Sequence, residues 1–205
     1  MTKSELKKYL ERTLDIIRTA KQYVYDSQCI LLLDTAEKDE VIRPNKFMYR
    51  TYVALWTLAI IDTHKLFGGR NDDSRLQKLI YYLMDAYRNS DWREDITLEE
   101  IKILEAKLAD PKVVAAAELL KELRSQHYAH KQRTPKRHET EVGLDFKGAD
   151  FLLNVAEGLC DTINEKLFDN RVAKHKIDKE SVNMTIEHLV KKDVRQPKLK
   201  ALRSS

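Results

Sequence analysis

The sequence is poor in residues that interrupt helices and in residues that cross-link chains. Its 205 residues include only five glycines and four prolines, whereas Leu, Ala, Lys and Glu are plentiful. This composition predicts helices throughout and argues against an all-β domain. The two cysteines, Cys29 and Cys160, lie far apart in the sequence. We therefore expect reduced, core-facing thiols rather than a disulfide framework.

The chain also lacks a strong net charge and any long apolar run. Its formal net charge at pH 7 is +4, so affinity for nucleic acid would have to come from local clusters of basic side chains. The longest apolar runs, around 29–33 and 53–61, are too short to span a bilayer. No signal peptide is recognisable, and we expect a cytoplasmic protein that does not enter the membrane.

The motifs that usually mark metal and nucleotide sites are missing as well. There is no HExxH or CxxC pattern and no Gly-rich phosphate loop. Asp62, His64, His127 and His130 could be imagined as metal ligands, but no such pattern supports them, and the sequence predicts neither a metal nor a cofactor. His64 follows an apolar run and is expected to be a hydrogen-bonded core or boundary residue.

What the sequence does contain is a series of amphipathic helical patterns. Apolar residues recur at helical spacing in segments that begin near Ser4, Phe47, Ser74, Thr97, Asp110 and Gly148. Polar stretches at 34–40, 89–95 and 134–145 are expected to connect them. Thr97 with Glu100 forms a capping-box pattern at the start of one segment. We expect an all-α, up-and-down bundle of five or six helices over residues 1–170. Residues 171–205 would be an extension with a weak helix over 179–190 and a loose, basic tail.

The segment from Asp110 to His138 is the strongest candidate for chemistry. Asp110 can cap a helix whose first residue is Pro111, and an apolar stripe of Val113, Val114, Ala117, Leu120 and Leu123 is expected to face the core. From Leu123 onward the segment contains no acidic residue, five basic residues and three of the six histidines. Pro135 is expected to stop any helix here.

Arg124 and His130 could act together on a phosphodiester. The imidazole can accept or donate a proton and the guanidinium can hold phosphate charge, while RNA supplies its own nucleophile through the 2′-OH. Spacing alone is weak support, because residues six apart point about 120° away from each other on a helix. The alternative is a polar helix end, where histidine is favoured by the helix dipole.

The segment ELRSQHYAHKQ, residues 122–132, resembles the signature of the HEPN superfamily, in which an arginine and a polar residue precede a histidine late in a helical bundle. The form of the motif is most similar to the abortive-infection AbiU-like branch. The upstream ALWTLAIIDTHKLFGG and SRLQKLI also resemble that branch. The resemblance covers roughly residues 6–168.

This resemblance implies a homodimeric, metal-independent ribonuclease of the toxin or phage-defence kind. Arg124 would stabilise the phosphate, Ser125 would be the polar residue of the motif, and His130 would be the acid or base. Neighbouring candidates for RNA contact are His127, Tyr128, Lys131 and Arg133. A further alternative is a toxin that a partner, such as a nucleotidyltransferase-type antitoxin, silences.

Two alternatives remain open at this point. Ser125 stands where the motif commonly has Asn, Asp or His, which favours a non-catalytic HEPN-like bundle that acts as a dimeric binding or interaction module. Tyr128 can stack on a base or simply pack on a neighbouring helix. The sequence does not indicate the target RNA or its cut site.

Overall fold

The computed structural model describes residues 2–68, 75–88, 95–129, 142–168 and 176–203, with side chains except at 126–129, 142–145 and 193–203. Every regular element within these ranges is a helix, so the all-α prediction is confirmed for them. In chain order the helices are α1 (Lys3–Leu31), α2 (Ala36–Ile42), α3 (Lys46–Phe67), α4 (Leu76–Arg88), α5 (Leu98–Leu108), α6 (Pro111–Ala129), α7 (Val142–Phe168) and α8 (Ser181–Arg203).

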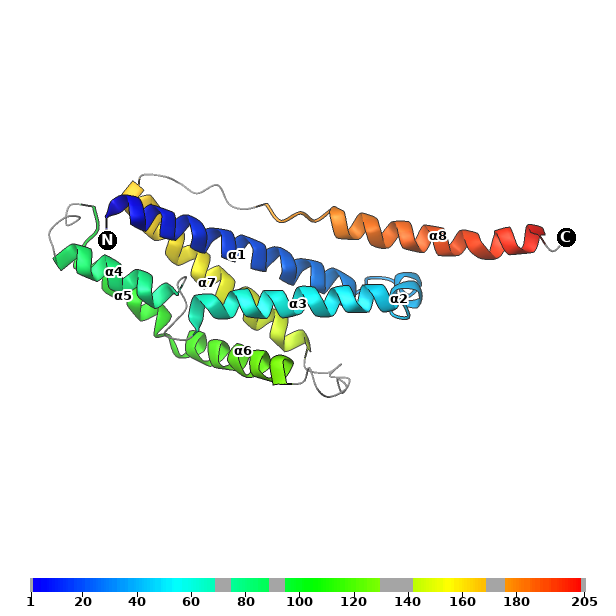
Figure 1. Cartoon of the computed structure of the whole chain (residues 1–205), viewed down its shortest axis with the longest axis horizontal. Coiled ribbons are helices and arrows are strands. Elements are labelled where there is room, and N and C mark those ends of the chain that lie inside the picture. The colour runs from blue at the N-terminus through cyan, green and yellow to red at the C-terminus, as the bar shows by residue number, and fades with distance from the viewer. Residues whose placement is uncertain (1, 69–74, 89–94, 130–141, 169–175, 204–205) are drawn as a thin grey trace.

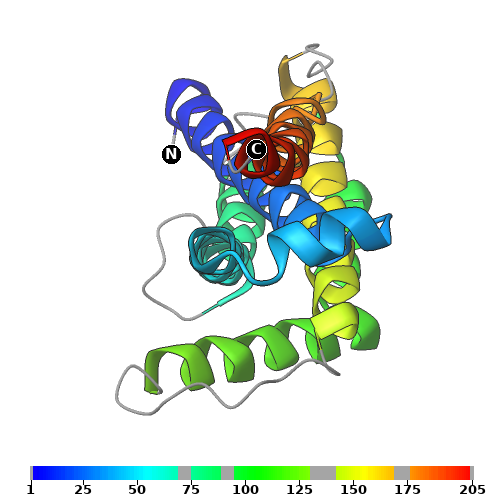
Figure 2. The same ribbon diagram turned by 90° about the vertical axis from the view of Figure 1, so that its right-hand side faces the viewer.

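Helices α1, α3 and α7 form the middle of the molecule (Figure 1). α1 packs against both of the others, and it runs in the opposite direction to α3. α4 and α5 pair at one end of the bundle, while α8 packs on α2 and α1 at the other. α6 lies across the bundle beneath α3 and α7 instead of continuing the up-and-down alternation (Figure 2).

The apolar faces of these helices meet in one continuous core. Trp56 of α3 contacts Phe146 of α7 edge to face, with ring centroids 4.5 Å apart, a favoured geometry for aromatic pairs. Other fully buried side chains come from four further helices: Leu6, Ile17, Leu76, Leu79, Ile101, Leu104 and Ile186. Among the described helices, none is both long enough and apolar enough to cross a bilayer.

The bundle was expected to contain five or six helices over residues 1–170, and the described ranges place seven there, α1 to α7, while α8 corresponds to the weak helix expected in the extension. The stretch 34–40 was expected to be a connection but includes most of α2, where Thr35 accepts a hydrogen bond from Lys38 N and Ile42 is buried. The basic tail expected to be loose continues α8 to Arg203. Extending a packed helix costs less than nucleating one, which explains this continuation.

Other boundaries agree with the local signals in the sequence. Thr97 Oγ1 accepts from Glu100 N at 3.2 Å while Glu100 Oε2 accepts from Thr97 N at 2.8 Å, which confirms the predicted capping box of α5. Asp110 Oδ1 accepts from Lys112 N at 2.7 Å and caps α6 as expected. α7 begins at Val142, inside the segment predicted as a loop. Ser74, the expected start of α4, lies outside the described ranges.

Glu100 also ties α5 to α7. Its Oε1 lies 2.7 Å from Lys166 Nζ, in the last turn of α7. The Lys166 hydrogen bond, followed by the hydrogen bonds from the backbone and side chain of Thr97, lowers the pKa of Glu100 from 4.5 to about 2. The Glu100 carboxylate therefore both caps α5 and joins α5 to α7, the helices that precede and follow α6 in the sequence.

Two polar contacts fix how α1 and α7 align. Lys21 Nζ lies 2.5 Å from Glu157 Oε2, and Gln28 Nε2 donates to Asp150 Oδ2 at 3.3 Å. Both pairs are largely shielded from solvent, and each helix spaces its two partners seven residues apart. Seven residues are close to two helical turns, so both contacts lie along one antiparallel seam.

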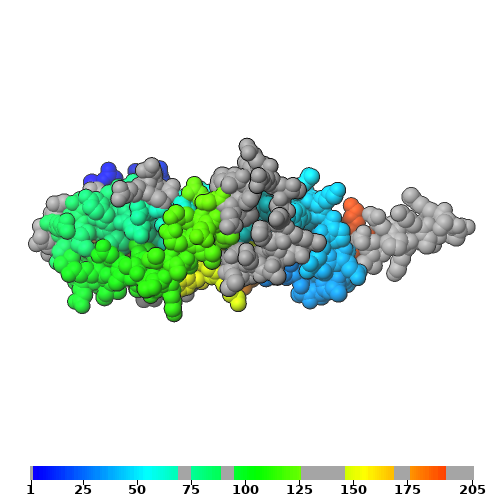
Figure 3. Space-filling view, turned by 90° about the horizontal axis from the view of Figure 1, so that it is seen from below, coloured from blue at the N-terminus to red at the C-terminus, as the bar shows by residue number. Residues whose placement is uncertain are grey.

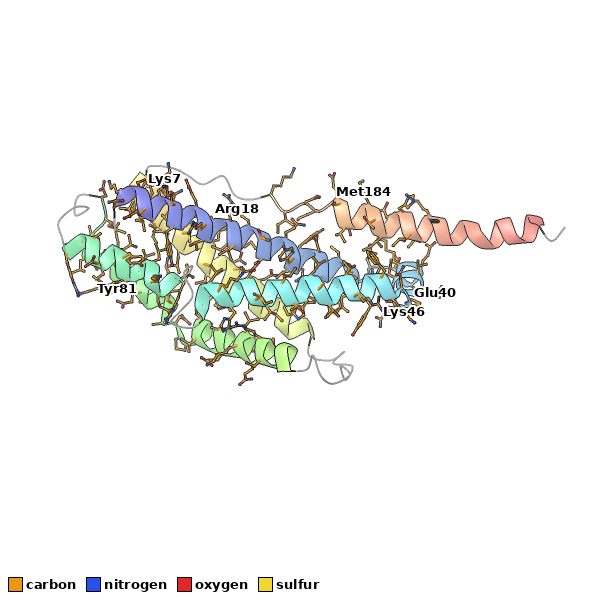
Figure 4. All side chains as sticks on the ribbon, in the orientation of Figure 1. Lys7, Arg18, Glu40, Lys46, Tyr81 and Met184 are labelled. Carbon is orange, nitrogen blue, oxygen red and sulfur yellow. The ribbon has the colours of Figure 1, made fainter. Side chains whose placement is uncertain are left out.

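Several apolar side chains point away from the core. Val114 and Phe151 were expected to face inward but are 48% and 39% exposed. In Figure 4, Tyr81 projects from α4 and Met184 from α8, consistent with their large exposed fractions. The expectation for the cysteines is confirmed in that Cys160 is buried, Cys29 is half-buried, and both are free thiols.

Candidate functional site

Arg124 lies on the last described turns of α6, the helix that carries the predicted motif. Leu120 is buried and Leu123 half-buried, so this side of α6 faces the bundle and brings the half-buried Arg124 toward α3. α6 forms part of the face shown in Figure 3, beside α4 and α5. The helix thus holds a basic side chain at the boundary between core and surface.

The guanidinium of Arg124 contacts His64 of α3. Arg124 Nη1 lies 3.0 Å from His64 Nδ1 and 3.5 Å from Nε2. Because Nη1 is close to both ring nitrogens, it lies over the face of the imidazole ring rather than in line with the lone pair of one nitrogen. An imidazole adds no negative charge beside the guanidinium, in contrast to a carboxylate.

Gly68 lies directly against the His64 ring. It caps α3, and its N–H donates to His64 O at 2.6 Å. A Cβ atom added at Gly68 would lie 2.3 Å from His64 Cε1, 2.4 Å from Nδ1 and 2.4 Å from the carbonyl oxygen. No side chain fits there while the ring and the helix end stay in place. A backbone without a side chain is what lets the imidazole occupy this position.

Of the rest of the imagined metal set, only Asp62 has a described side chain. Asp62 Oδ1 pairs with Lys65 Nζ at 2.6 Å on α3 itself. No group of three His, Cys, Asp or Glu side chains suited to a metal occurs among the residues whose side chains are described. The side chains of His127 and His130 are not among these residues.

Ser125, the polar residue of the motif, is exposed on α6. Its Oγ donates to the Lys121 carbonyl oxygen at 2.9 Å, a hydrogen bond within its own helix. His127 and Tyr128 belong to α6, although their side chains are not described, and His130, Lys131 and Arg133 lie outside the described ranges. Of the three predicted catalytic residues, the structure therefore places Arg124 and Ser125, and both stay predictions.

His64 is the member of this site whose role the sequence did not reveal. Its prediction as a hydrogen-bonded core or boundary residue is confirmed, because it is only 8% exposed and contacts Arg124. A buried imidazole needs a hydrogen-bond partner, and that requirement was the available signal. The partner is 60 residues away in the sequence, beyond what helical periodicity can indicate.

No protein-family model matches the chain, and searches of curated proteins and of solved structures found no match either.

Proposed function

We propose that this chain is a metal-independent endoribonuclease of the HEPN toxin or phage-defence type. It would act as a homodimer that cleaves RNA through the ribose 2′-OH. The observation that carries the proposal is the position of Arg124, half-buried at the end of α6 and held by the imidazole of His64. The HEPN-like signature around Arg124, Ser125 and His130 supplies the expected reaction.

Arg124 suits the role of stabilising charge on phosphate. A guanidinium offers several N–H donors in a planar fork, and one of them contacts His64 Nδ1 at 3.0 Å. A donor group that is oriented before the substrate binds pays little reorganisation cost when negative charge develops in the transition state. Partial burial strengthens such an interaction relative to bulk water.

The proposed reaction is an intramolecular transesterification. The 2′-oxygen forms a bond to phosphorus while the bond from phosphorus to the 5′-oxygen breaks, leaving a 2′,3′-cyclic phosphate and a 5′-hydroxyl. His130 either accepts the 2′-OH proton as a neutral imidazole or donates a proton to the leaving 5′-oxygen. In a homodimer, the second copy supplies another Arg124 and His130 to the same groove.

Cleavage of RNA in EDTA tests the proposal. We expect the wild-type protein to cleave, and Arg124→Ala to lose activity by about 10²-fold or more, as for loss of an oxyanion-stabilising donor. His130→Ala should lose activity by a similar factor. Arg50→Ala is the matched control, because it removes an exposed arginine from α3 far along the chain from the motif. Equal cleavage by the wild type and all three variants would refute the enzymatic proposal.

A non-catalytic, dimeric interaction module is the second candidate. The hydrogen bond from Ser125 Oγ to Lys121 O favours this module, because the hydroxyl donates to its own helix and not to a substrate. In that case His130→Ala would leave the biological phenotype unchanged, whereas breaking the dimer would abolish it. Light scattering combined with a phenotype assay separates the two candidates.

A nucleotidyltransferase-type antitoxin remains the proposed partner of the toxin. Its support is the HEPN-like motif alone. Coexpression with the product of the neighbouring gene should yield a stable complex with suppressed cleavage. Free chain and unchanged cleavage after coexpression would remove this part of the proposal.

A further inference from the structure

The net positive charge of the chain is concentrated in the last part of α8. Residues 191–203 contain six of the 37 lysines and arginines but only one of the 33 acidic residues. The other 31 basic and 32 acidic residues lie in 1–190, so that part of the chain is close to neutral. We call residues 191–203 the distal arm. Its basic residues are Lys191, Lys192, Arg195, Lys198, Lys200 and Arg203.

The distal arm extends beyond the bundle. α8 packs on α2 and α1, and Ile186 and Val190 are its buried side chains among those described, whereas Lys191 and Lys192 are exposed. Figure 1 shows the rest of α8 continuing past α2 and past every other labelled helix. At 1.5 Å per residue the arm is about 18 Å long. This length matches about five phosphates of a stacked nucleic-acid strand.

The order of residues along the arm favours a polyanion over a membrane or a partner helix. Lys191, Arg195 and Lys198 follow the spacing of one helical stripe. At about 100° per residue, Leu199 and Leu202 fall between basic positions and do not form an opposite apolar face. The arm also contains no aromatic residue. A helix that lies on a membrane needs a separate apolar face, commonly with bulky aromatic residues.

We propose that the distal arm binds the phosphate backbone of single-stranded RNA and gives the substrate a second contact apart from Arg124. The choice of RNA rests on the proposed function. Lysine and arginine side chains that neutralise phosphates release bound counterions, which gives affinity without dependence on base sequence. In Figure 1, α6 runs toward the same end of the molecule beyond which the arm projects. A strand longer than the arm can therefore extend from it toward the motif.

The ion pair described at the start of the arm is weak enough for phosphate to compete with it. Lys191 Nζ lies 3.6 Å from Glu187 Oε2, and the two side chains are 70% and 52% exposed. Exposed pairs of this kind contribute little, because water and salt screen them. Binding to RNA thus replaces a screened contact with a phosphate contact at little cost.

Fluorescence anisotropy with a 2′-O-methyl RNA oligonucleotide measures the arm without cleavage. The methyl group blocks the 2′-OH nucleophile and leaves every phosphate in place. The arm variant replaces all six of its basic residues with Gln in the full chain. The matched control variant also replaces four exposed lysines and two exposed arginines with Gln, on α1, α3 and α5. These are Lys7, Lys8, Arg12, Lys46, Arg50 and Lys102.

The dependence of affinity on salt distinguishes phosphate contacts from a general effect of charge. Each phosphate contact on a single strand contributes about 0.7 to the slope of log K against log salt. We expect the arm variant to lower this slope by up to about 4 and to weaken binding at least about tenfold at physiological salt. The control variant should stay much closer to the wild type, and thermal unfolding should show that both variants are folded.

Three results would overturn the inference. Equal losses in the arm and control variants would mean that net charge alone accounts for binding. A wild type that does not bind the oligonucleotide at low salt would remove the RNA contact altogether. Binding of the arm to phosphatidylserine vesicles but not to RNA would assign it to a membrane surface instead.

Cleavage of ordinary RNA separates this inference from the proposed function. We expect the arm variant to raise KM with kcat unchanged, because the arm binds the ground state and the transition state equally. If cleavage still depends on Arg124 while KM of the arm variant matches the wild type, the arm does not bind substrate and the nuclease stands. If the oligonucleotide binds through the arm but no cleavage depends on Arg124, the arm stands and the proposed function falls.

Discussion

Glu100→Gln is expected to destabilise the protein near neutral pH and to have almost no effect in strong acid. In the folded protein the pKa of Glu100 is about 2, against the ordinary value of 4.5 for a glutamate, chiefly because of the Lys166 hydrogen bond and then the Thr97 hydrogen bonds. A lowered folded-state pKa stabilises the fold above the unfolded value, and this contribution disappears as pH falls through the folded value. The stabilising contribution of Glu100 is therefore lost between about pH 4.5 and about pH 2.

The size of the effect follows from the pKa and from solvent exposure. A drop from 4.5 to about 2 corresponds to roughly 3 kcal/mol if all of it counted toward folding. The Lys166 side chain is 48% exposed and that of Glu100 is 30% exposed, so water and salt screen much of the attraction. We therefore expect Glu100→Gln to lower the free energy of unfolding by about 1 kcal/mol near pH 7.

Urea unfolding followed by circular dichroism at several pH values measures this difference. Gln resembles a protonated Glu and can keep the capping box, so the two proteins should converge as pH approaches 2. Glu99→Gln is the control, because it removes an exposed carboxylate from the same turn of α5. It should cost only about 0.5 kcal/mol, the helix-dipole contribution. A Glu100→Gln deficit that stays constant from neutral pH into acid would refute the electrostatic explanation.

Two further predictions concern α7. Burial raises the pKa of the Cys160 thiol far above its usual range. Cys160 should therefore resist thiol reagents in the native protein and react only in urea. Labelling of both cysteines at equal rates before unfolding would contradict this prediction. Gly158→Ala should raise the free energy of unfolding by about 0.5–1 kcal/mol, because nothing lies within 4 Å of the added Cβ and alanine favours the helix. A lower unfolding midpoint for Gly158→Ala would show that α7 requires the glycine for another reason.

Local signals in the sequence predicted local structure well. The capping box at Thr97 and Glu100 and the Asp110 cap involve residues two or three positions apart, and both form as expected. α2 was missed because a two-turn helix with one buried residue, Ile42, has too few apolar positions to show a period.

The orientation of α6 was harder to predict for a different reason. Its run of Val113 to Ala117 is apolar on nearly every side, so periodicity could not tell that Val114 would be exposed and Val113 buried. The contact of Arg124 with His64 depends on how α6 crosses α3, which is a property of tertiary packing. Half of the candidate site could thus be found from a motif, and the other half required the fold.

The two contacts between α1 and α7 constrain which changes of length these helices can accept. One extra residue between Lys21 and Gln28 would turn the following part of α1 by about 100° and separate Gln28 from Asp150. An insertion of seven residues in both helices between these partners would instead preserve the facing sides. The seam therefore restricts the lengths that α1 and α7 can have together. Lengthened variants of this bundle should keep both contacts only when each helix gains about two helical turns at a time.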